Sequence, residues 1–312
     1  MDIAIDLIYN VGLLFLMLIP GVLLAKCRLA TDGLGKGLAN LVLYIAQPAL
    51  IVVAYIRPYS QEILMNLLYV FLFSVVAHLL FAVAAFLSYR RAPEGMRKML
   101  RFATVFSNAA YMGIPLLEAV LGLEAAIYAS IYSITFNVFI WSLGVFLCTG
   151  DKKQASPKKV LTHPVVIASA LGILLFFLPV ENYVPTLVIE ALTMLKNLVA
   201  PLSMIIIGLR LSDIDLRGIF RDRYLYQFLC MRLLILPFIV FALMRGLLFL
   251  GVPISREVMT VILVSASTPA ATATSMFAEK FDCDALYAGK LVSISTILSI
   301  ATMPLLSLLL EI

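Results

Sequence analysis

The chain has 312 residues, of which 63% are hydrophobic and only 13% are charged. A soluble domain of this length carries about a quarter charged residues, so the composition excludes a soluble enzyme or binding module and indicates a protein of the lipid bilayer. The formal net charge is +5. We assign this excess to loops at the membrane surface and to anionic lipid headgroups, and we expect no nucleic-acid partner.

Apolar runs of about 20 residues recur along the whole chain, and this is the length of helix that crosses a bilayer. The sequence predicts ten membrane-spanning helices. They cover residues 6–25, 37–56, 63–89, 99–121, 124–148, 164–179, 187–211, 224–250, 256–279 and 285–310. The polar linker 149–162 separates a first unit of five helices (1–148) from a second (163–312).

Basic residues are concentrated in alternate connections between the predicted helices. The odd-numbered connections contain Lys26, Arg28 and Lys36; Arg90, Arg91, Arg97, Lys98 and Arg101; Lys152, Lys153, Lys158 and Lys159; Arg210, Arg217, Arg221 and Arg223; and Lys280. The even-numbered connections contain only Arg57, Arg245 and Arg256. Because basic residues are retained on the cytoplasmic side, we expect a multi-pass plasma-membrane protein with a cytoplasmic linker and both termini outside.

The two halves resemble each other weakly. At an offset of 160 residues Ser107 aligns with Ser267 and Ala110 with Ala270, and each half has a proline in its second helix, Pro48 or Pro201. A repeat with an odd number of spans places its second copy upside down. Inverted repeats with interrupted helices at corresponding positions are typical of secondary transporters. The predicted fold is therefore an all-α membrane protein of two inverted five-helix repeats.

The fourth and ninth predicted helices each contain residues that interrupt a helix. Gly113 and Pro115 lie in the fourth, and Pro269 lies among six Ser and Thr residues in the ninth. A broken helix in hydrocarbon is tolerated only where protein or a water-filled cavity satisfies the free backbone groups. One interpretation is an ordinary proline kink with Ser and Thr bonding back to the backbone. The other is a shared cavity at which positive helix N-termini face an anion.

These segments resemble the auxin efflux carrier family over nearly the whole chain. The similarity lies in NLVLYIAQPALIV (40–52), SNAAYMGIPL (107–116), HPVVIASALGILL (163–175), APLSMIIIGLRL (200–211), TPAATATSMFAEKFDCD (268–284) and STILSIATMPL (295–305). The resemblance implies the inverted-repeat fold of the bile-acid sodium symporters, with helices 4 and 9 crossing at their breaks. It also implies a scaffold domain from helices 1, 2, 6 and 7, a mobile transport domain from helices 3–5 and 8–10, a homodimer through the scaffold, and elevator-type transport of small organic anions such as auxins or dicarboxylates.

Residues around the two interruptions are the candidate substrate ligands. They are Asn108, Tyr111, Gly113, Pro115, Thr268, Pro269, Ala270 and Thr272, with Gln47 on the opposite wall. An amide, a phenol and hydroxyl groups can bond a carboxylate, and helix breaks expose backbone N–H groups. The alternative is that these side chains only satisfy the unwound backbone.

Lys290 and Arg232 are among the basic residues that lie inside predicted helices. Lys290 is about one turn into the tenth helix, where a lysine costs about 2.5–3.5 kcal/mol on insertion scales. Its ammonium is predicted to replace a coupling cation near Ser107, Asn108, Ser133 or Asn137, or else to reach the cytoplasmic surface. Arg232 is expected to reach that surface. The sodium-coupled relatives use an acidic residue at the ninth-helix crossover, which has none here, so coupling to protons is favoured over sodium.

No enzymatic or metal-binding motif is present. The four cysteines, Cys27, Cys148, Cys230 and Cys283, have no CxxC spacing, and no HExxH or GxSxG occurs. GLGKG (33–37) lacks the Ser or Thr of a phosphate-binding loop. We therefore predict no cofactor, no metal and no catalytic residues. A channel-like or receptor protein using the same cavity is the alternative to a secondary transporter.

Overall fold

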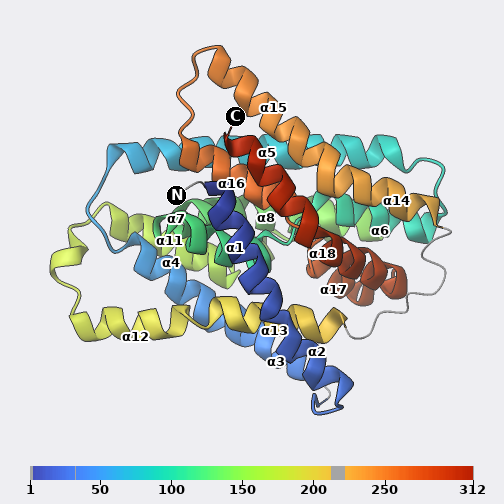
Figure 1. Cartoon of the computed structure of the whole chain (residues 1–312), viewed down its shortest axis with the longest axis horizontal. Helices are drawn as coiled ribbons and strands as arrows, with labels where there is room; N and C mark the ends of the chain where they lie inside the picture. Colours follow the sequence, from blue (N-terminus) through green and yellow to red (C-terminus); the bar gives the residue numbers. More distant parts are fainter. Residues whose placement is uncertain (1–2, 32, 212–221, 312) are drawn as a thin grey trace.

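The computed structural model describes residues 3–31, 33–211 and 222–311 (Figure 1). Within these residues the regular structure is helical, apart from an isolated antiparallel bridge between Ser107 and Ala270. The predicted all-α class is therefore confirmed for the described chain. Arg217 and Arg221, which the sequence assigns to a cytoplasmic connection, lie outside the described residues.

The described part of the first half and the linker contains twelve segments of α-helix and π-helix and two short linker helices. They are α1 (Ile3–Leu16), α2 (Leu18–Lys26), α3 (Leu34–Leu41), the π turn η1 (Val42–Ala46), α4 (Gln47–Tyr55), α5 (Gln61–Ser88), α6 (Glu94–Val105), the π turn η2 (Ala109–Gly113), α7 (Ile114–Leu121), α8 (Glu124–Phe139), the π turn η3 (Ile140–Gly144), α9 (Val145–Thr149), η4 (Lys152–Gln154) and α10 (Pro157–Leu161).

The second half follows a similar order of segments. They are α11 (Pro164–Phe176), η5 (Val180–Asn182), α12 (Thr186–Lys196), α13 (Val199–Leu211), α14 (Arg223–Cys230), the π turn η7 (Met231–Ile235), α15 (Leu236–Phe249), α16 (Arg256–Ser267), α17 (Ala273–Lys280), α18 (Ala285–Ser307) and η8 (Leu308–Glu311).

Seven helices of the described chain are long and apolar enough to cross a membrane. They are Ile8–Lys26, Leu34–Tyr55, Gln61–Ser88, Glu124–Thr149, Thr186–Leu211, Arg223–Phe249 and Ala285–Glu311, and two shorter apolar helices are Ala109–Leu121 and Pro164–Phe176. The fourth, sixth and ninth predicted spans do not form single long helices. The fourth and ninth are interrupted at 106–108 and 268–272, and the sixth ends at Phe176.

Close backbone contacts join helices from the two halves of the chain. α2 packs against α13, and a Cβ added at Gly21 or Gly208 would lie 2.3 Å from Ile205 O or 2.2 Å from Leu18 O. These two glycines let the helices touch backbone to backbone. α4 packs against α11 and α12, α5 packs against α6 and α8, and α8 also contacts α4 and α11.

The apolar interior consists of two clusters that meet at the interrupted helices. One cluster includes η2, α7 and α16 residues such as Ala109, Leu116 and Ile262. The other includes α6 and α17 residues such as Phe102 and Phe277. Each interrupted segment thus contributes one half to each cluster, and the two breaks lie at the boundary between them.

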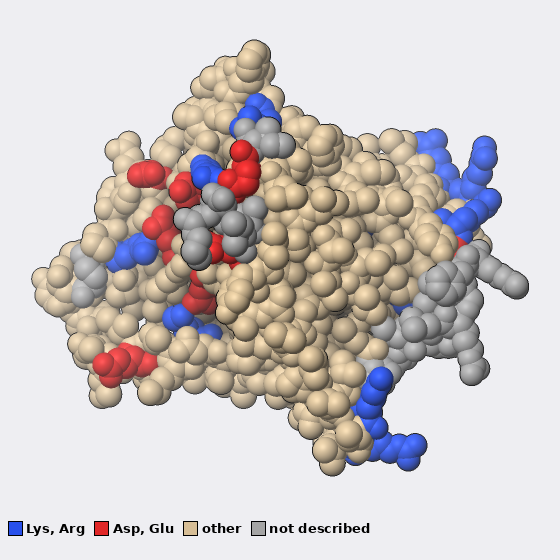
Figure 2. All heavy atoms as spheres, viewed as in Figure 1, with Lys and Arg blue, Asp and Glu red and all other residues tan. Residues whose placement is uncertain are grey.

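The surface shows a broad band with few charged residues between two charged ends (Figure 2). At the left end in this view, acidic and basic side chains are mixed. At the right edge and below it, Lys and Arg predominate. Large exposed apolar side chains such as Phe71, Phe238 and Ile300 belong to helices between those ends. This pattern is that of a protein embedded in hydrocarbon.

Candidate functional site

The two interrupted segments cross and hydrogen-bond to each other. α6 ends at Val105 and η2 begins at Ala109, while α16 ends at Ser267 and α17 begins at Ala273. Asn108 N donates to Pro269 O at 2.8 Å, and Ala271 N donates to Phe106 O at 2.9 Å. Each unwound stretch therefore satisfies backbone groups of the other, which allows both breaks to exist in an apolar interior.

The first interruption lies earlier than its glycine and proline suggest. The chain leaves the helix at 106–108, whereas Gly113 ends the π turn η2 and Pro115 lies in the first turn of α7. Proline is tolerated there because the π turn η2, with its irregular hydrogen bonds, directly precedes α7 in the helix Ala109–Leu121. Gly113 faces Thr268 of the second break, where an added Cβ would lie at an ordinary contact distance of 3.5 Å from Thr268 Cγ2. Pro269, in contrast, lies within its break.

Arg232 lies beside this crossing, and the expectation that it reaches the membrane surface is wrong. Its side chain is 0% exposed. Nη1 donates to Thr104 O at 3.4 Å, and Nη2 donates to Ala266 O at 3.0 Å and to Thr268 O at 2.9 Å. Arg232 belongs to the π turn η7, an irregular turn of a kind that often occurs at functional positions.

A cavity of about 330 Å³ lies next to the crossing. Four predicted site residues line it, namely Gln47, Tyr111, Ser133 and Asn137. The remaining lining residues are Leu43, Tyr44, Ala109, Ala110, Phe136, Ile140, Trp141, Lys159, Thr162, His163, Pro164, Val165, Ala273, Met276, Phe277 and Lys280. The first residues of η2 and α17 are in this set, so helix N-termini face the space.

Gln47 connects the wall formed by α4 to the crossing. The side chain is buried, and its Nε2 donates to Ala110 O at 2.8 Å. Asn137 Nδ2 donates to Ser133 O at 2.8 Å, and Ser133 Oγ donates to Ala129 O at 2.9 Å. The cavity therefore has polar groups on opposite walls, α4 and α8, within a largely apolar lining.

Two lysines and an aromatic ring form the mouth of the cavity. Lys159 Nζ lies 4.7 Å and Lys280 Nζ 4.9 Å from the centroid of the Trp141 ring. Partial burial, followed by the charge of Lys159, lowers the pKa of Lys280. His163 lies beside them, and burial lowers its pKa to about 4, so its ring is neutral at pH 7. We define these three residues, Lys159, Lys280 and Trp141, as the lysine mouth.

The remaining predicted ligands form the crossing itself rather than the cavity lining. Ser107 Oγ lies 3.3 Å from Tyr132 Oη, and Ala270 N donates to Ser295 Oγ at 3.1 Å. Thr268 Oγ1 donates to Ser265 O, and Thr272 O accepts from Arg210 Nη1. Gly113 ends η2, Pro115 lies in the first turn of α7, and Pro269 lies within the second break. These contacts match the alternative interpretation that such groups support the unwound backbone.

Asn108 and Lys290 differ from the rest of the predicted set. Asn108 is buried at the crossing, and its Nδ2 has no hydrogen-bond partner among the described residues. A buried amide donor without a partner is costly and is available to a ligand. Lys290 is partly exposed on α18 and is not part of the cavity lining.

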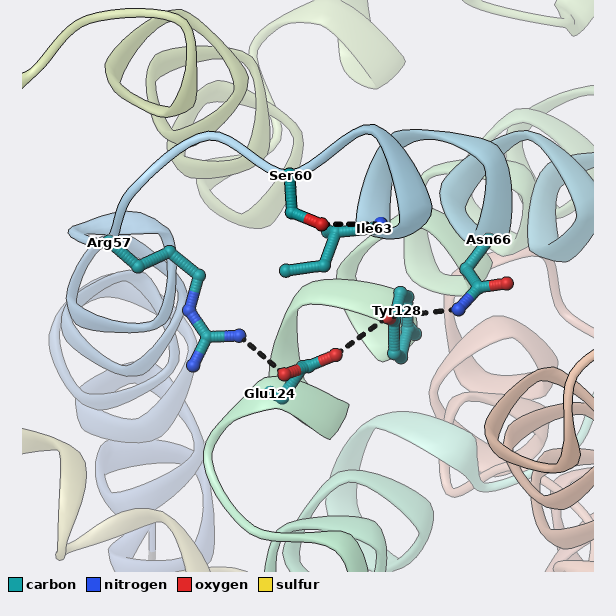
Figure 3. A network of polar contacts seen from close by, with 6 residues as sticks. All are labelled: Arg57, Ser60, Ile63, Asn66, Glu124 and Tyr128. Carbon is teal, nitrogen blue, oxygen red and sulfur yellow. Dashed lines mark hydrogen bonds and ion pairs between the residues drawn. The ribbon is translucent and has the colours of Figure 1, made fainter.

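Two ion pairs that the sequence does not reveal join α12 to α7, and the residues after α4 to α8, at the end of these helices away from the cavity. Lys196 Nζ of α12 lies 2.5 Å from Glu118 Oε1 of α7, and Arg57 Nη1 lies 2.8 Å from Glu124 Oε2 of α8. Tyr128 Oη donates to Glu124 Oε1 at 2.8 Å and accepts from Asn66 Nδ2 at 3.3 Å (Figure 3). Both pairs join residues distant in sequence, so no local pattern could predict them.

Comparison with known proteins identifies the family. Residues 7–307 match the model of the membrane transport protein family. This chain belongs to that family, the auxin efflux carrier family that its sequence motifs resemble. It is 28% identical over 213 residues to an uncharacterized transporter of Methanothermobacter thermautotrophicus, covering 68% of this chain and 67% of that protein. It is 23% identical over 280 residues to an uncharacterized transporter of Methanocaldococcus jannaschii, covering 86% and 88%.

Proposed function

We propose that this membrane transport protein is a secondary active transporter of small organic anions that binds its substrate where the interrupted helices cross. The observation that carries the proposal is the cavity beside the crossing, which holds the first residues of η2 and α17 together with Gln47 and Tyr111. Helix N-termini with unpaired N–H groups favour a negative charge. A carboxylate of the substrate in the cavity would accept hydrogen bonds from those N–H groups. Asn108 Nδ2, which has no partner among the described residues and lies outside the cavity lining, would be a further donor at the crossing.

The architecture in this proposal is that of ten spans in two inverted five-helix repeats, 1–148 and 163–312. α1–α4 and α11–α13 form the scaffold, and α5–α9 and α14–α18 form the transport domain. Three observations support the division. The two interruptions pair with each other through Ser107 and Ala270; α2 and α13 touch through Gly21 and Gly208; and α4 packs on α11 and α12.

The two ends of the interface between these domains suggest which side is open. The cavity leads to the lysine mouth beside the linker, while the Lys196–Glu118 and Arg57–Glu124 pairs join the proposed domains at the other end. In this proposal the linker is cytoplasmic, the termini are outside and the protein lies in the plasma membrane. Because the cavity opens beside the linker, the structure then represents an inward-open state. Elevator movement of the transport domain would break both pairs and carry the crossing toward the outside.

Transport by counterflow in proteoliposomes tests the proposal. Vesicles containing the full chain and preloaded with unlabelled malonate should accumulate labelled malonate transiently, and malate, indole-3-acetate and acetate should be compared as competitors. Saturable counterflow supports a transporter, whereas a channel-like or receptor protein gives none. Empty vesicles are the background. An Asn108→Ala variant should weaken counterflow, because it removes the unpartnered donor.

If no tested carboxylate produces counterflow or raises the melting temperature of the purified protein, the organic-anion assignment is wrong. Where counterflow is observed, the measurement is repeated with sodium replaced by choline and then with the proton gradient collapsed. The two conditions distinguish coupling to sodium from coupling to protons. We expect the proton gradient to matter and sodium not to matter.

A further inference from the structure

The C-terminal ends of two half-helices meet on one side of the crossing. α6 and α16 both run into it, and Thr104 and Ala266 are each the second-last residue of their helix. The last carbonyl groups of a helix lack internal partners, and each helix end carries about −0.5 of an elementary charge. Two such ends together amount to about −1. This side of the crossing therefore favours a cation.

The Arg232 guanidinium supplies that cation. It contacts Thr104 O of α6, Ala266 O of α16 and Thr268 O of the second break, at 3.4, 3.0 and 2.9 Å. One side chain thus bridges both half-helices. The planar guanidinium has several donors in a fixed geometry and can satisfy three carbonyl groups that point from different directions.

No carboxylate pairs with Arg232 in the part of the chain that the structure describes. The side chain is fully buried, the centroid of the Phe81 ring lies 5.2 Å from Cζ, and Nε has no hydrogen-bond partner among the described residues. A buried charge is costly unless its surroundings compensate it. Here the compensation comes from main-chain carbonyl groups, which are also the ligands that broken helices in transporters offer to a sodium ion.

We propose that Arg232 is a resident cation that occupies the carbonyl side of the crossing and makes a bound metal cation there unnecessary. The geometry thereby assigns to Arg232 the role that sequence considerations give to Lys290. Arg232 is a positioning residue: it holds α6 and α16 together so that the opposite side of the crossing, with the N-termini of η2 and α17, keeps its shape. The inference is independent of which anion is transported.

Melting of the purified full chain in detergent tests this inference without a substrate. Wild type, Arg232→Met, Arg232→Gln, Arg232→Lys and the control Arg223→Met are compared in choline chloride, sodium chloride, lithium chloride and choline chloride with added guanidinium, all at one ionic strength. Arg223 lies in the same long helix segment but is exposed. It therefore controls for the loss of an arginine as such.

Wild type and Arg223→Met should melt at the same temperature in sodium and choline. The two neutral variants should melt roughly 5–10 °C lower in choline, because three buried carbonyl groups lose their donor. They should regain at least half of that loss, with saturation at millimolar concentration, when sodium, lithium or guanidinium is added. Arg232→Lys keeps a charge and should show a smaller loss and no cation response.

Three results would overturn the inference. The first is a saturable rise in the wild-type melting temperature with sodium, since the place would then be open to a metal ion. The second is a neutral variant that melts like Arg223→Met. The third is a loss of stability that no cation reverses, including failure of both neutral variants to fold in every buffer, because this outcome indicates an ordinary packing role. All three can occur whether or not anion counterflow is observed.

Discussion

α4, α11 and α12 pack against the helices of the proposed transport domain. The charged side chains at the two ends of this interface have different partners. At one end, each cation lies on a carboxylate, as Lys196 on Glu118 and Arg57 on Glu124. At the other end, Lys159 and Lys280 lie on the ring of Trp141 beside a cavity. A cation already paired with a carboxylate stabilises a closed contact, whereas a cation on an aromatic face keeps its charge available to an anion. The difference indicates one closed end and one end open to a ligand.

The less exposed ion pair should have the largest effect on stability. The side chains of Lys196 and Glu118 are 14% and 22% exposed. Lys196→Met leaves the Glu118 carboxylate partly buried without its partner, which should lower the free energy of unfolding by about 2 kcal/mol. Thermal denaturation measures the change. The double variant Lys196→Met with Glu118→Leu removes both charges and should recover most of the loss; no recovery would show that the pair is not coupled.

The lysine mouth should control anion affinity rather than stability. Replacing both lysines with Met, Lys159→Met and Lys280→Met, should weaken malonate binding about tenfold, which corresponds to about 1.4 kcal/mol. Trp141 is the single tryptophan of the chain, so its fluorescence reports binding at this place. The control is Lys158→Met on the same linker helix, since Lys158 is exposed and not part of the cavity lining. Equal effects of both changes would contradict a local role.

His163 gives the open end a pH dependence. Burial lowers its pKa from 6.5 to about 4 in the folded chain, so the unfolded chain takes up a proton at higher pH than the folded chain does. Stability contributed by the neutral ring is present above about pH 6.5 and is lost as the pH falls toward 4. Because the ring is partly exposed, we expect a loss of about 1 kcal/mol. His163→Gln should reduce the dependence of the melting temperature on pH between pH 6.5 and 4.5. An unchanged dependence would contradict a role of His163.

The more exposed ion pair should have the smallest effect. Arg57 and Glu124 are 26% and 40% exposed, and pairs of this kind contribute below about 1 kcal/mol. Arg57→Met should therefore lower the free energy of unfolding by roughly 0.5 kcal/mol. Lys98→Met is the matched control, because Glu94 of the Lys98–Glu94 pair is 74% exposed. Removing this pair should change the free energy of unfolding by close to zero. A loss at Arg57 larger than that at Lys196 would reverse the comparison.

The sequence could predict the elements but not all of the contacts between them. Hydropathy indicates the helices, and Pro269 among hydroxyl residues predicts the second interruption correctly. Pro115 misplaces the first, because the π turn η2 accommodates this proline within the helix Ala109–Leu121. The chain unwinds before η2, where Pro269 O and Ala271 N are available as partners. That partner comes from the other half of the chain, and its position is set by tertiary packing.

Arg232 was open to prediction from the sequence, unlike the ion pairs. It lies nine residues after Arg223, the first residue of α14, which is about 14 Å along a helix. An arginine side chain does not easily span this depth, so the sequence is also compatible with a buried Arg232. Lys196–Glu118 joins residues 78 positions apart, and neither side chain carries a local signal for the other.

The π turns have a consequence for how this chain can change in evolution. η1, η2, η3 and η7 each contain one residue more than a regular helical turn; η1 and η2 adjoin Gln47 and Asn108, and η3 and η7 contain Trp141 and Arg232. Removing one residue from such a turn restores a regular helix but rotates everything beyond it by about 100°. Single-residue deletions that most surface loops absorb would here turn a side chain away from its partners. Length should therefore be preserved in these segments even where residue identity drifts.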